Sequence, residues 1–485
     1  MAKSIMVLGT SSNAGKSLIT AGLCRILSQE GYSVAPFKAQ NMALNSYITE
    51  DGLEMGRAQV VQAEACGLKP DCRMNPILMK PTSDEGSQII LNGKVLGNLT
   101  ARDFYRHKQF FRDEVRKTYE SLSSDYDILV MEGAGSPSEI NLRENDLVNM
   151  GMAEMADADV LLVGDIDRGG VFASLVGTMV LFTEEERARV RGIIINKFRG
   201  DLSILKPGLE QLEKIINVPV LGVVPYMDID IDDEDSLTER FNRAKVPSII
   251  DIAVIRLPKI SNFTDFSPFE RMKGVGVRYV ERASDLGSPD LIIIPGTKNT
   301  MVDLLWMRKT GIEAAVIKRH STGCPVFGVC GGYQILGQSI SDPHCVEHDG
   351  EITGMGLLPH HTVFNREKVT KETTGTLSRV GGIFNALSGK KYTGYEIHMG
   401  SQESSNNIIN KGDAYGTYIH GIFDTEAIAS VIVKALMKKR GLDPSDIQTV
   451  DTDTYKQQQY DILADGLRKS IDMNVIYAMI KGATL

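Results

Sequence analysis

The stretch that most constrains this chain is FGVCGGYQIL, residues 327–336, where a short apolar run meets glycines and then a helical pattern. The run 325–329 predicts a strand, and the apolar pattern from Tyr333 predicts a helix. Cys330 is therefore expected on a sharp strand-to-helix turn, where the helix N-terminus favours a thiolate. A buried structural cysteine before a glycine turn is the alternative, but glycines on both sides of the cysteine favour an activated nucleophile.

Strand-like runs alternate with helical stretches, and this predicts an α/β fold. The runs are apolar throughout rather than at every second residue, as expected for parallel sheets covered by helices on both faces. In the first half they lie at residues 4–8, 33–37, 127–131, 159–163, 192–196 and 219–223. In the second half they lie at residues 249–255, 291–294, 325–329 and 416–419. We therefore predict two doubly wound, mostly parallel-sheet domains.

A change in composition predicts where the two domains meet. The chain of 485 residues is too long for one ordinary domain, and an acidic stretch, DIDIDDED, occupies residues 228–235 before a polar segment. The predicted parts are a first domain at 1–235, a linker at 236–248, a second domain at 249–440 and a C-terminal helical extension at 441–485.

Charge and cysteine content restrict the class of partner. The formal net charge is −9, from 53 Lys plus Arg against 62 Asp plus Glu, which argues against nucleic acid or an anionic membrane and favours a small soluble substrate. The six cysteines form no CxxC pair or secreted framework, which favours free thiols in a reducing cytoplasm. No signal-peptide pattern and no run long enough to span a bilayer is found, so we expect a cytoplasmic protein.

Residues 9–17, GTSSNAGKS, follow the first predicted strand and lead into a helix, the arrangement of a phosphate-binding loop. Small residues let successive N–H groups surround an anion, and the helix N-terminus adds positive potential. Lys16 is expected to reach the terminal phosphates of ATP or GTP, and Ser17 to bind Mg²⁺. The loop departs from GxxxxGK[ST] by one residue. The predicted nucleotide-binding residues in it are Thr10, Asn13, Gly15, Lys16 and Ser17.

Two further strands end in polar residues at the predicted edge of the same sheet. Glu132 follows the run 128–131 and is the predicted second ligand of Mg²⁺, because ligands of doubly wound sheets bind at the carboxyl ends of the strands. Asn196 closes the strand GIIIN and resembles the amide that recognises the nucleotide base in phosphate-loop proteins.

Two other polar segments are candidates for substrate contact. GDIDRGG, residues 164–170, combines Asp165 and Arg168 with paired glycines at a helix start and predicts a second anion and metal locus. An N-terminal helix cap alone would explain only part of this cluster. The segment that contains Asp146, SEINLRENDLVNM, is too rich in charge for a core, and a solvated loop is its alternative interpretation.

A cysteine nucleophile needs a base and donors for an oxyanion. His420, which ends the apolar strand GTYIH, is the first choice for the base. The backbone N–H of Gly331 is the expected oxyanion donor, and Gly296, at the end of the strand LIIIP, is the second. The competing histidines are His360, His361 and His398.

These motifs together resemble the cobyric acid synthase family of the cobalamin pathway, in which a dethiobiotin-synthetase-like ATP domain is joined to a class I type glutamine amidotransferase domain. The resemblance spans nearly the whole chain. The motifs that carry it, in order, are GTSSNAGKS, KAQNMALNS, EGAGSPSEINL, DIDRGGVFASLVGT, NKFRGD, PGTKNT, FGVCGGYQ, GYEIHMG and TYIHGIF.

The resemblance implies ATP, Mg²⁺ and glutamine-dependent amidation of the b, d, e and g carboxylates of adenosylcobyrinic a,c-diamide through acyl phosphates. Cys330 and His420 would release ammonia from glutamine, while Asp146 or Asp165 would position the substrate or assist the ammonia. A large anionic corrinoid needs cationic and amide contacts. The residues expected to supply them are Lys38, Gln40, Asn41, Asn45, Asp165 and Arg168.

One departure from ordinary class I amidotransferases concerns the third catalytic residue. Those proteins carry a carboxylate two residues after the histidine, where this chain has Ile422. We therefore expect a Cys330–His420 dyad, with another group such as Glu396 orienting the imidazole.

Two other functions remain open at this point. Cobyrinic acid a,c-diamide synthase shares the architecture and differs in the carboxylates that it amidates, but KAQNMALNS and GDIDRGG favour the cobyric branch. A partition-type ATPase switch would share the phosphate loop and the sheet, but it has no use for FGVCGGYQ.

Overall fold

The computed structural model describes residues 2–82, 86–232, 248–401, 406–446 and 451–482. These residues form two compact units. The first unit contains residues 1–42, 55–231 and 456–485, and the second contains residues 43–54 and 232–455. Nearly all of the predicted linker, 236–248, lies outside the described residues.

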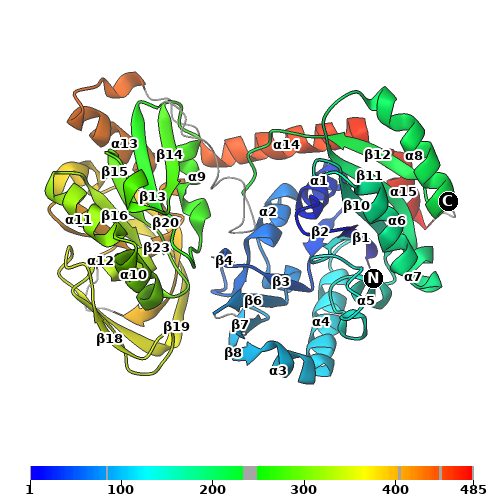
Figure 1. The fold of residues 1–485 in the computed structure, drawn as a ribbon, viewed down its shortest axis with the longest axis horizontal. Helices are drawn as coiled ribbons and strands as arrows, with labels where there is room; N and C mark the ends of the chain where they lie inside the picture. The colour runs from blue at the N-terminus through cyan, green and yellow to red at the C-terminus, as the bar shows by residue number, and fades with distance from the viewer. Residues whose placement is uncertain (1, 83–85, 233–247, 402–405, 447–450, 483–485) are drawn as a thin grey trace. The chain divides into compact units, whose positions relative to one another are not determined.

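The first unit is built around a six-stranded parallel sheet in the order β12-β11-β10-β1-β9-β2 (Figure 1). The strands β1, β2, β9 and β10 are buried on both faces, which explains why their sequences are almost continuously apolar, whereas the edge strand β12 is only partly buried. Their bounds are β1 Lys3–Gly9, β2 Val34–Phe37, β9 Ile128–Glu132, β10 Asp159–Asp165, β11 Val190–Phe198 and β12 Val220–Pro225.

Helices flank this sheet, and the phosphate loop lies between β1 and the first helix. The helices of the first unit are α1 Lys16–Gln29, α2 Arg57–Ala65, α3 Ala101–Arg106, α4 Lys108–Ser123, α5 Met150–Met155, α6 Val171–Leu181, α7 Glu184–Arg189, α8 Leu202–Ile216 and α15 Met473–Lys481. The helix α14, Thr452–Ser470, begins in the second unit and continues in the first.

A four-stranded sheet in the order β3-β6-β7-β8 adds to the first unit. Its strands are β3 Gln40–Met42, β6 Ile77–Pro81, β7 Gly86–Leu91 and β8 Lys94–Thr100. Two very short strands, β4 Ser46–Ile48 and β5 Glu54–Gly56, pair with each other where the chain enters and leaves the second unit.

The second unit has its own six-stranded sheet, in the order β14-β13-β15-β16-β22-β21, parallel except for the edge pair β21–β22. The strands are β13 Ile250–Ile255, β14 Val275–Val280, β15 Leu291–Ile294, β16 Val326–Val329, β21 Ile409–Lys411 and β22 Ala414–Thr417. Both sheets therefore confirm the predicted α/β class and the mostly parallel strands.

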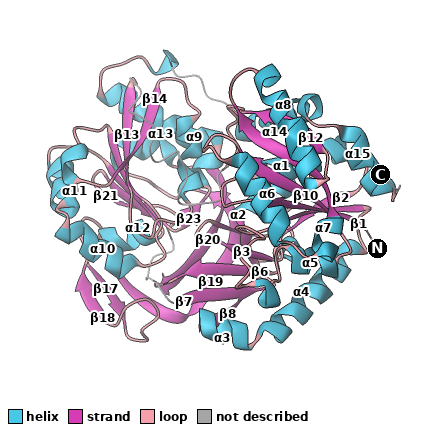
Figure 2. Cartoon of the chain, turned by 45° about the vertical axis from the view of Figure 1, so that its right-hand side comes forward, coloured by secondary structure: helices cyan, strands magenta, loops and turns pink. Residues whose placement is uncertain are grey.

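Helices cover both faces of this second sheet (Figure 2). One face packs against α9 Ser267–Glu270 and α13 Glu426–Lys439. The other face packs against α10 Thr300–Lys309, α11 Ile312–Ser321 and α12 Gly331–Leu336.

A further five-stranded sheet, β18-β17-β19-β20-β23, was not predicted. Its long pair β19–β20 is antiparallel and carries many polar residues, so it lacks the continuous apolar pattern of the parallel strands. The strands are β17 Ser339–Asp342, β18 Gly350–Thr353, β19 His361–Thr376, β20 Lys391–Ser401 and β23 Ile419–His420.

The C-terminal residues pack on the first unit rather than extending from the second. Tyr460, Leu463 and Leu467 of α14 are buried with residues of α1 and α2 in one core. A Cβ atom at Gly22 of α1 would lie only 2.2 Å from Leu467 Cδ1. Residues 456–482, which are part of the predicted extension, therefore complete the core of the first unit. In the described parts of the chain, no helix combines the length and apolarity needed to cross a membrane.

This packing predicts that shortening a buried side chain of α14 destabilises the first unit. Leu467→Ala should lower the free energy of unfolding of the first unit by about 3 kcal/mol, since it leaves a cavity against α1. Ile462→Ala on the same helix, where the side chain is 52% exposed, should change it by less than about 0.5 kcal/mol. Urea denaturation measures both, and equal effects would contradict the packing.

Candidate functional site

The phosphate loop has the backbone that its sequence predicts. Residues 10–15 leave β1 and enter α1, and the amide of Thr10 donates to a carbonyl of β10 at 3.0 Å. Asn13 and Gly15 have positive φ values of 61° and 96°, which curl the loop. A Cβ at position 15 would lie 2.0 Å from Asn196 Nδ2, so only glycine fits there. The loop is thus folded tightly in front of a helix N-terminus, as a phosphate site requires.

Side chains around the loop hold its lysine and serine in place. Lys16 Nζ donates to the carbonyl oxygens of Ser11 at 3.0 Å and Gly135 at 2.8 Å. Ser17 Oγ donates to Glu132 Oε1 at 2.8 Å. The structure therefore brings together the loop and the carboxylate that follows β9, two features that lie more than a hundred residues apart in the sequence.

Glu132 is the centre of a buried polar cluster. Besides Ser17, it accepts hydrogen bonds from Lys38 Nζ at 3.1 Å and from Gln62 Nε2 at 2.5 Å. The Ser17 hydroxyl and the Glu132 carboxylate are hard oxygen donors of the kind that Mg²⁺ prefers, so these two residues would hold the ion. Sequence reasoning missed Gln62, whose signal was a second glutamine three residues earlier in the run AQVVQA.

The residues of KAQNMALNS are divided between the two units. Lys38, Gln40 and Asn41 belong to the first unit, where Asn41 Nδ2 donates to Gln59 Oε1 at 3.3 Å. Asn45 is buried and belongs to the second unit. Lys38 joins the Glu132 cluster directly, so it is the member of this motif that the structure links to the phosphate loop.

Asp165, at the end of β10, lies beside the phosphate loop. Its Oδ2 pairs with Lys197 Nζ at 2.9 Å, and the same ammonium donates to the carbonyl of Asn13 at 2.7 Å. Arg168 Nε lies 3.9 Å from Asp165, and the Arg168 side chain is 64% exposed. Lys197 was not singled out from the sequence, although a lysine next to Asn196 at a strand end was a usable signal.

Asn196 and Asp146 make contacts within the scaffold. Asn196 Nδ2 donates to the Ala14 carbonyl at 3.0 Å and so supports the phosphate loop from behind. Asp146 accepts hydrogen bonds from the amides of Val148, Asn149 and Gly151 and holds the start of α5. The base-recognition role of Asn196 and the catalytic role of Asp146 stay predictions.

In the second unit, Cys330 lies on the predicted strand-to-helix turn between β16 and α12. Its φ and ψ values, 51° and −109°, are strained for a residue with a side chain. Glycine is required at position 332, after Cys330, because a Cβ at Gly332 would lie 1.9 Å from the Ile294 carbonyl oxygen. The Cys330 thiol points toward β20, where it lies 3.4 Å from the Ile397 carbonyl oxygen.

His420 lies at the same sheet edge as Cys330, as the sequence predicts, because β22 pairs with β16 in a register that puts Val329 opposite Thr417. Its Nδ1 is 2.7 Å from Asp265 Oδ2, and both side chains are buried. Burial alone would lower the pKa of His420, but the charges of Asp265 and Cys330 outweigh it and raise that pKa to about 10.

Asp265, rather than Glu396, is the carboxylate that contacts the histidine. Glu396 instead lies 3.2 Å from His398 Nε2 and pairs with Lys371 at 3.1 Å, so its predicted role as the orienting group is wrong. Asp265 follows β13 on a short helical turn, and its second oxygen accepts the Gly421 amide at 2.9 Å. The sequence signal that could have found Asp265 is a single carboxylate within the aromatic segment NFTDFSPF, a pattern that predicts burial.

The predicted oxyanion donors, Gly331 and Gly296, lie close to Cys330 and His420. Gly331 is the first residue of α12, and a Cβ placed on it would lie 3.0 Å from the Thr297 amide nitrogen. A Cβ on Gly296 would lie 3.0 Å from His420 Cε1. The turn after β15 and the start of α12 therefore converge beside the histidine, and the roles of the two glycine amides in binding an oxyanion stay predictions.

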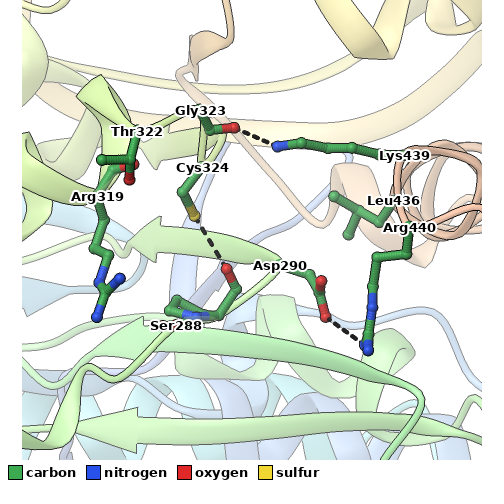
Figure 3. Close-up of a pocket in the computed structure, with 10 residues that line it drawn as sticks. Ser288, Asp290, Arg319, Thr322, Gly323, Cys324, Leu436, Lys439 and Arg440 are labelled. Carbon is green, nitrogen blue, oxygen red and sulfur yellow. Dashed lines mark hydrogen bonds and ion pairs between the residues drawn. The ribbon is translucent and has the colours of Figure 1, made fainter.

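A second cysteine, Cys324, lines a cavity of about 250 Å³ in the same unit (Figure 3). Its thiol donates to the Pro289 carbonyl at 3.3 Å, and burial raises its pKa to about 11. Asp290 and Arg440, which also line this cavity, form an ion pair at 3.4 Å. Cys324 is therefore a protonated structural thiol, and the cavity is not part of the Cys330 arrangement.

The raised pKa of His420 predicts a pH-dependent stability. The imidazolium should stabilise the folded protein fully below about pH 6.5, where the unfolded chain is also protonated. This stabilisation should be lost as the pH rises toward about 10, since only the folded state keeps the proton in that interval. Thermal denaturation of the wild type and Asp265→Asn across this range measures the difference. A difference between the two proteins that does not change with pH would contradict the ion pair.

Comparison with known proteins identifies the family. Residues 5–237 match the CobQ/CobB/MinD/ParA nucleotide binding domain, and residues 251–428 match the CobB/CobQ-like glutamine amidotransferase domain. Cobyric acid synthase of Ruminiclostridium cellulolyticum is 57% identical, covering 99% of this chain and 98% of the relative. The proteins of that name from Lachnoclostridium phytofermentans and Alkaliphilus metalliredigens are 55% and 49% identical, covering 99% and 98% of this chain and 99% and 100% of the relatives.

These matches span both units and nearly the full length of the relatives, so the resemblance drawn from the sequence motifs is confirmed. The chain belongs to the cobyric acid synthase family.

Proposed function

We propose that this enzyme amidates the b, d, e and g carboxylates of adenosylcobyrinic a,c-diamide, using ATP and glutamine. The observation that carries the proposal is that one chain holds both a phosphate loop with its carboxylate and a cysteine with a buried His–Asp pair. The first arrangement suits activation of a carboxylate, and the second suits release of ammonia from an amide. The cytoplasmic location stays part of this proposal.

A carboxylate is a poor electrophile and must be activated before ammonia can attack it. An oxygen of the substrate carboxylate attacks the γ-phosphorus of ATP, which gives an acyl phosphate and ADP. Lys16 and the loop amides stabilise the charge on the transferred phosphoryl group. Mg²⁺ held by Ser17 and Glu132 would neutralise charge on the phosphates. Ammonia then attacks the acyl carbon, phosphate departs, and the amide is formed.

Ammonia is supplied by the second unit. The Cys330 thiolate attacks the side-chain amide carbon of glutamine, and the Gly331 and Gly296 amides stabilise the oxyanion. His420 gives its proton to the departing nitrogen, which leaves as ammonia, and a thioester remains. The neutral His420 then takes a proton from water, which hydrolyses the thioester to glutamate and frees the thiolate. Asp265 keeps the imidazole oriented in both steps and stabilises its charged form.

The corrinoid contacts are assigned by chemistry. Lys38, Gln40, Asn41 and Asn45 offer an ammonium and amides to the carboxylates and amides of the substrate. Asp165 and Arg168 lie near the phosphate loop and would position the reacting carboxylate. Asn196 would contact the base of ATP, and Asp146 would assist the attack of ammonia.

Two variants test whether the second unit supplies the ammonia that amidation uses. Cys330→Ala should abolish amidation driven by glutamine, while amidation driven by ammonium should persist at the wild-type rate. Asp265→Asn should lower the glutamine-driven rate by about 10,000-fold, because the imidazole loses its orienting carboxylate. Amide formation is measured by mass spectrometry of the corrinoid. Full glutamine-driven amidation by Cys330→Ala would contradict the mechanism.

The number of amides formed distinguishes the cobyric branch from its close relative. The purified enzyme is incubated with ATP and with glutamine labelled at the amide nitrogen, and with either adenosylcobyrinic a,c-diamide or cobyrinic acid. The proposal predicts labelled amides at the b, d, e and g positions of the diamide. Labelling only of cobyrinic acid, at the a and c positions, would instead identify a cobyrinic acid a,c-diamide synthase. ATP hydrolysis without any labelled corrinoid would favour a partition-type switch.

A further inference from the structure

A short part of the N-terminal sequence belongs to the second unit. Residues 43–54 are grouped with the glutaminase-like unit, whereas the residues on both sides of them, up to Met42 and from Met55, belong to the first unit. This segment contains β4 and lies between two sequences that carry polar side chains of the Glu132 cluster.

The backbone carbonyl of Ser46 accepts two buried hydrogen bonds. Asn262 Nδ2 donates to it at 2.9 Å, and Tyr395 Oη donates to it at 3.0 Å. The two donors are themselves linked, because Asn262 Nδ2 lies 2.7 Å from Tyr395 Oη. One carbonyl of the segment 43–54 therefore fixes two side chains of the second unit.

Both of these side chains adjoin the catalytic groups. The Tyr395 ring stacks on His420, with the ring centroids 5.5 Å apart and the planes 22° from parallel. Asn262 begins the helical turn that carries Asp265, and the Asp265 amide donates to the Asn262 carbonyl at 3.0 Å. Ser46 thus contacts the supports of both members of the His–Asp pair.

Further contacts hold the segment 43–54 against β20 and β19. Tyr47 packs edge-on against Tyr395, with the ring centroids 5.2 Å apart, and Ile48 is buried with Tyr395 and Ile397. Glu54 pairs with Lys368 at 2.6 Å, and the Glu54 side chain is almost completely buried. The segment is therefore a packed part of the wall around the glutaminase residues.

The sequences that enter and leave this segment reach the phosphate side of the first unit. Before it, Lys38 bonds to Glu132, and Asn41 bonds to Gln59. After it, Gln62 bonds to the other oxygen of Glu132. Binding of nucleotide, metal or corrinoid at Glu132 and Lys38 would change these bonds on both sides of the segment, and the covalent chain passes the change to Ser46.

We infer that the segment 43–54 couples the ligase site to the glutaminase site, and that Tyr395 is the positioning residue through which Ser46 sets the orientation of His420. The inference rests on the proposed function and adds its regulation. Glutamine hydrolysis would then be fast only when ATP and the corrinoid occupy the first unit, so that ammonia is not released without an acceptor.

The test compares glutamine hydrolysis by the full-length enzyme with and without ATP plus adenosylcobyrinic a,c-diamide. The wild type should be stimulated by about tenfold, within the usual range of coupling between sites. Tyr395→Phe keeps the ring on His420 but removes the hydroxyl that contacts Ser46, so its stimulation should fall to about onefold. Stimulation of Tyr395→Phe equal to that of the wild type would overturn the inference.

Tyr392→Phe is the matched control. Tyr392 lies on the same strand and is equally buried, at 5% exposure for both tyrosines, but its hydroxyl contacts Asn407 rather than Ser46. This variant should keep the wild-type stimulation. A purely structural role for Tyr395 would lower the stimulated and unstimulated rates by the same factor and leave their ratio unchanged, which would overturn the inference.

Two further measurements distinguish a failure of the coupling from a failure of the proposed function. Ammonium-driven amidation should be the same in the wild type and Tyr395→Phe, and its absence in the wild type would overturn the proposed function itself. Hydrogen exchange of the wild type does not depend on any variant folding. Adding ATP and the corrinoid without glutamine should slow exchange in peptides covering 43–54 and 394–400, and no change in either peptide would overturn the coupling alone.

Discussion

The buried contact between Asp265 and His420 is the interaction on which the proposed chemistry of the second unit depends. A histidine removed from water would ordinarily be neutral, but a carboxylate at 2.7 Å and the neighbouring cysteine make the charged imidazolium the stable form. In the proposed reaction this imidazolium is the source of the proton that ammonia needs when it leaves glutamine. The geometry thus supports a Cys–His–Asp arrangement in which the carboxylate comes from a different strand end than in ordinary class I enzymes.

The same topological constraint builds both candidate sites. In each unit the polar groups of the candidate site follow the carboxyl ends of parallel strands, where loops converge and helix N-termini begin. Glu132 after β9 meets the phosphate loop after β1, and Asp265 after β13 meets His420 near the end of β22. The parallel arrangement of the strands therefore brings together residues more than a hundred positions apart in sequence, and Glu132 and Asp265 need no local motif of their own to reach these sites.

Groups carried by local motifs could be predicted from the sequence, and groups brought by packing could not. The strand, glycine and helix pattern around Cys330 predicted its strained turn, and GTSSNAGKS predicted the loop around Lys16. Asp265 was missed because a single carboxylate after a strand carries no spacing signal, and Glu396 was preferred only for its position near a histidine. The long antiparallel pair β19–β20 and the return of α14 to the first unit depend on tertiary contacts that periodicity does not encode.

The most direct test of this account is the protonation state of His420, observed by nitrogen NMR of histidine-labelled enzyme and assigned with a His420→Asn variant. At a pH between 6.5 and about 10, the account predicts an imidazole protonated on both nitrogens in the wild type. The second proton should be lost in Asp265→Asn. A neutral imidazole in the wild type that titrates near 6.5, the ordinary value for histidine, would contradict the central role of the Asp265 contact.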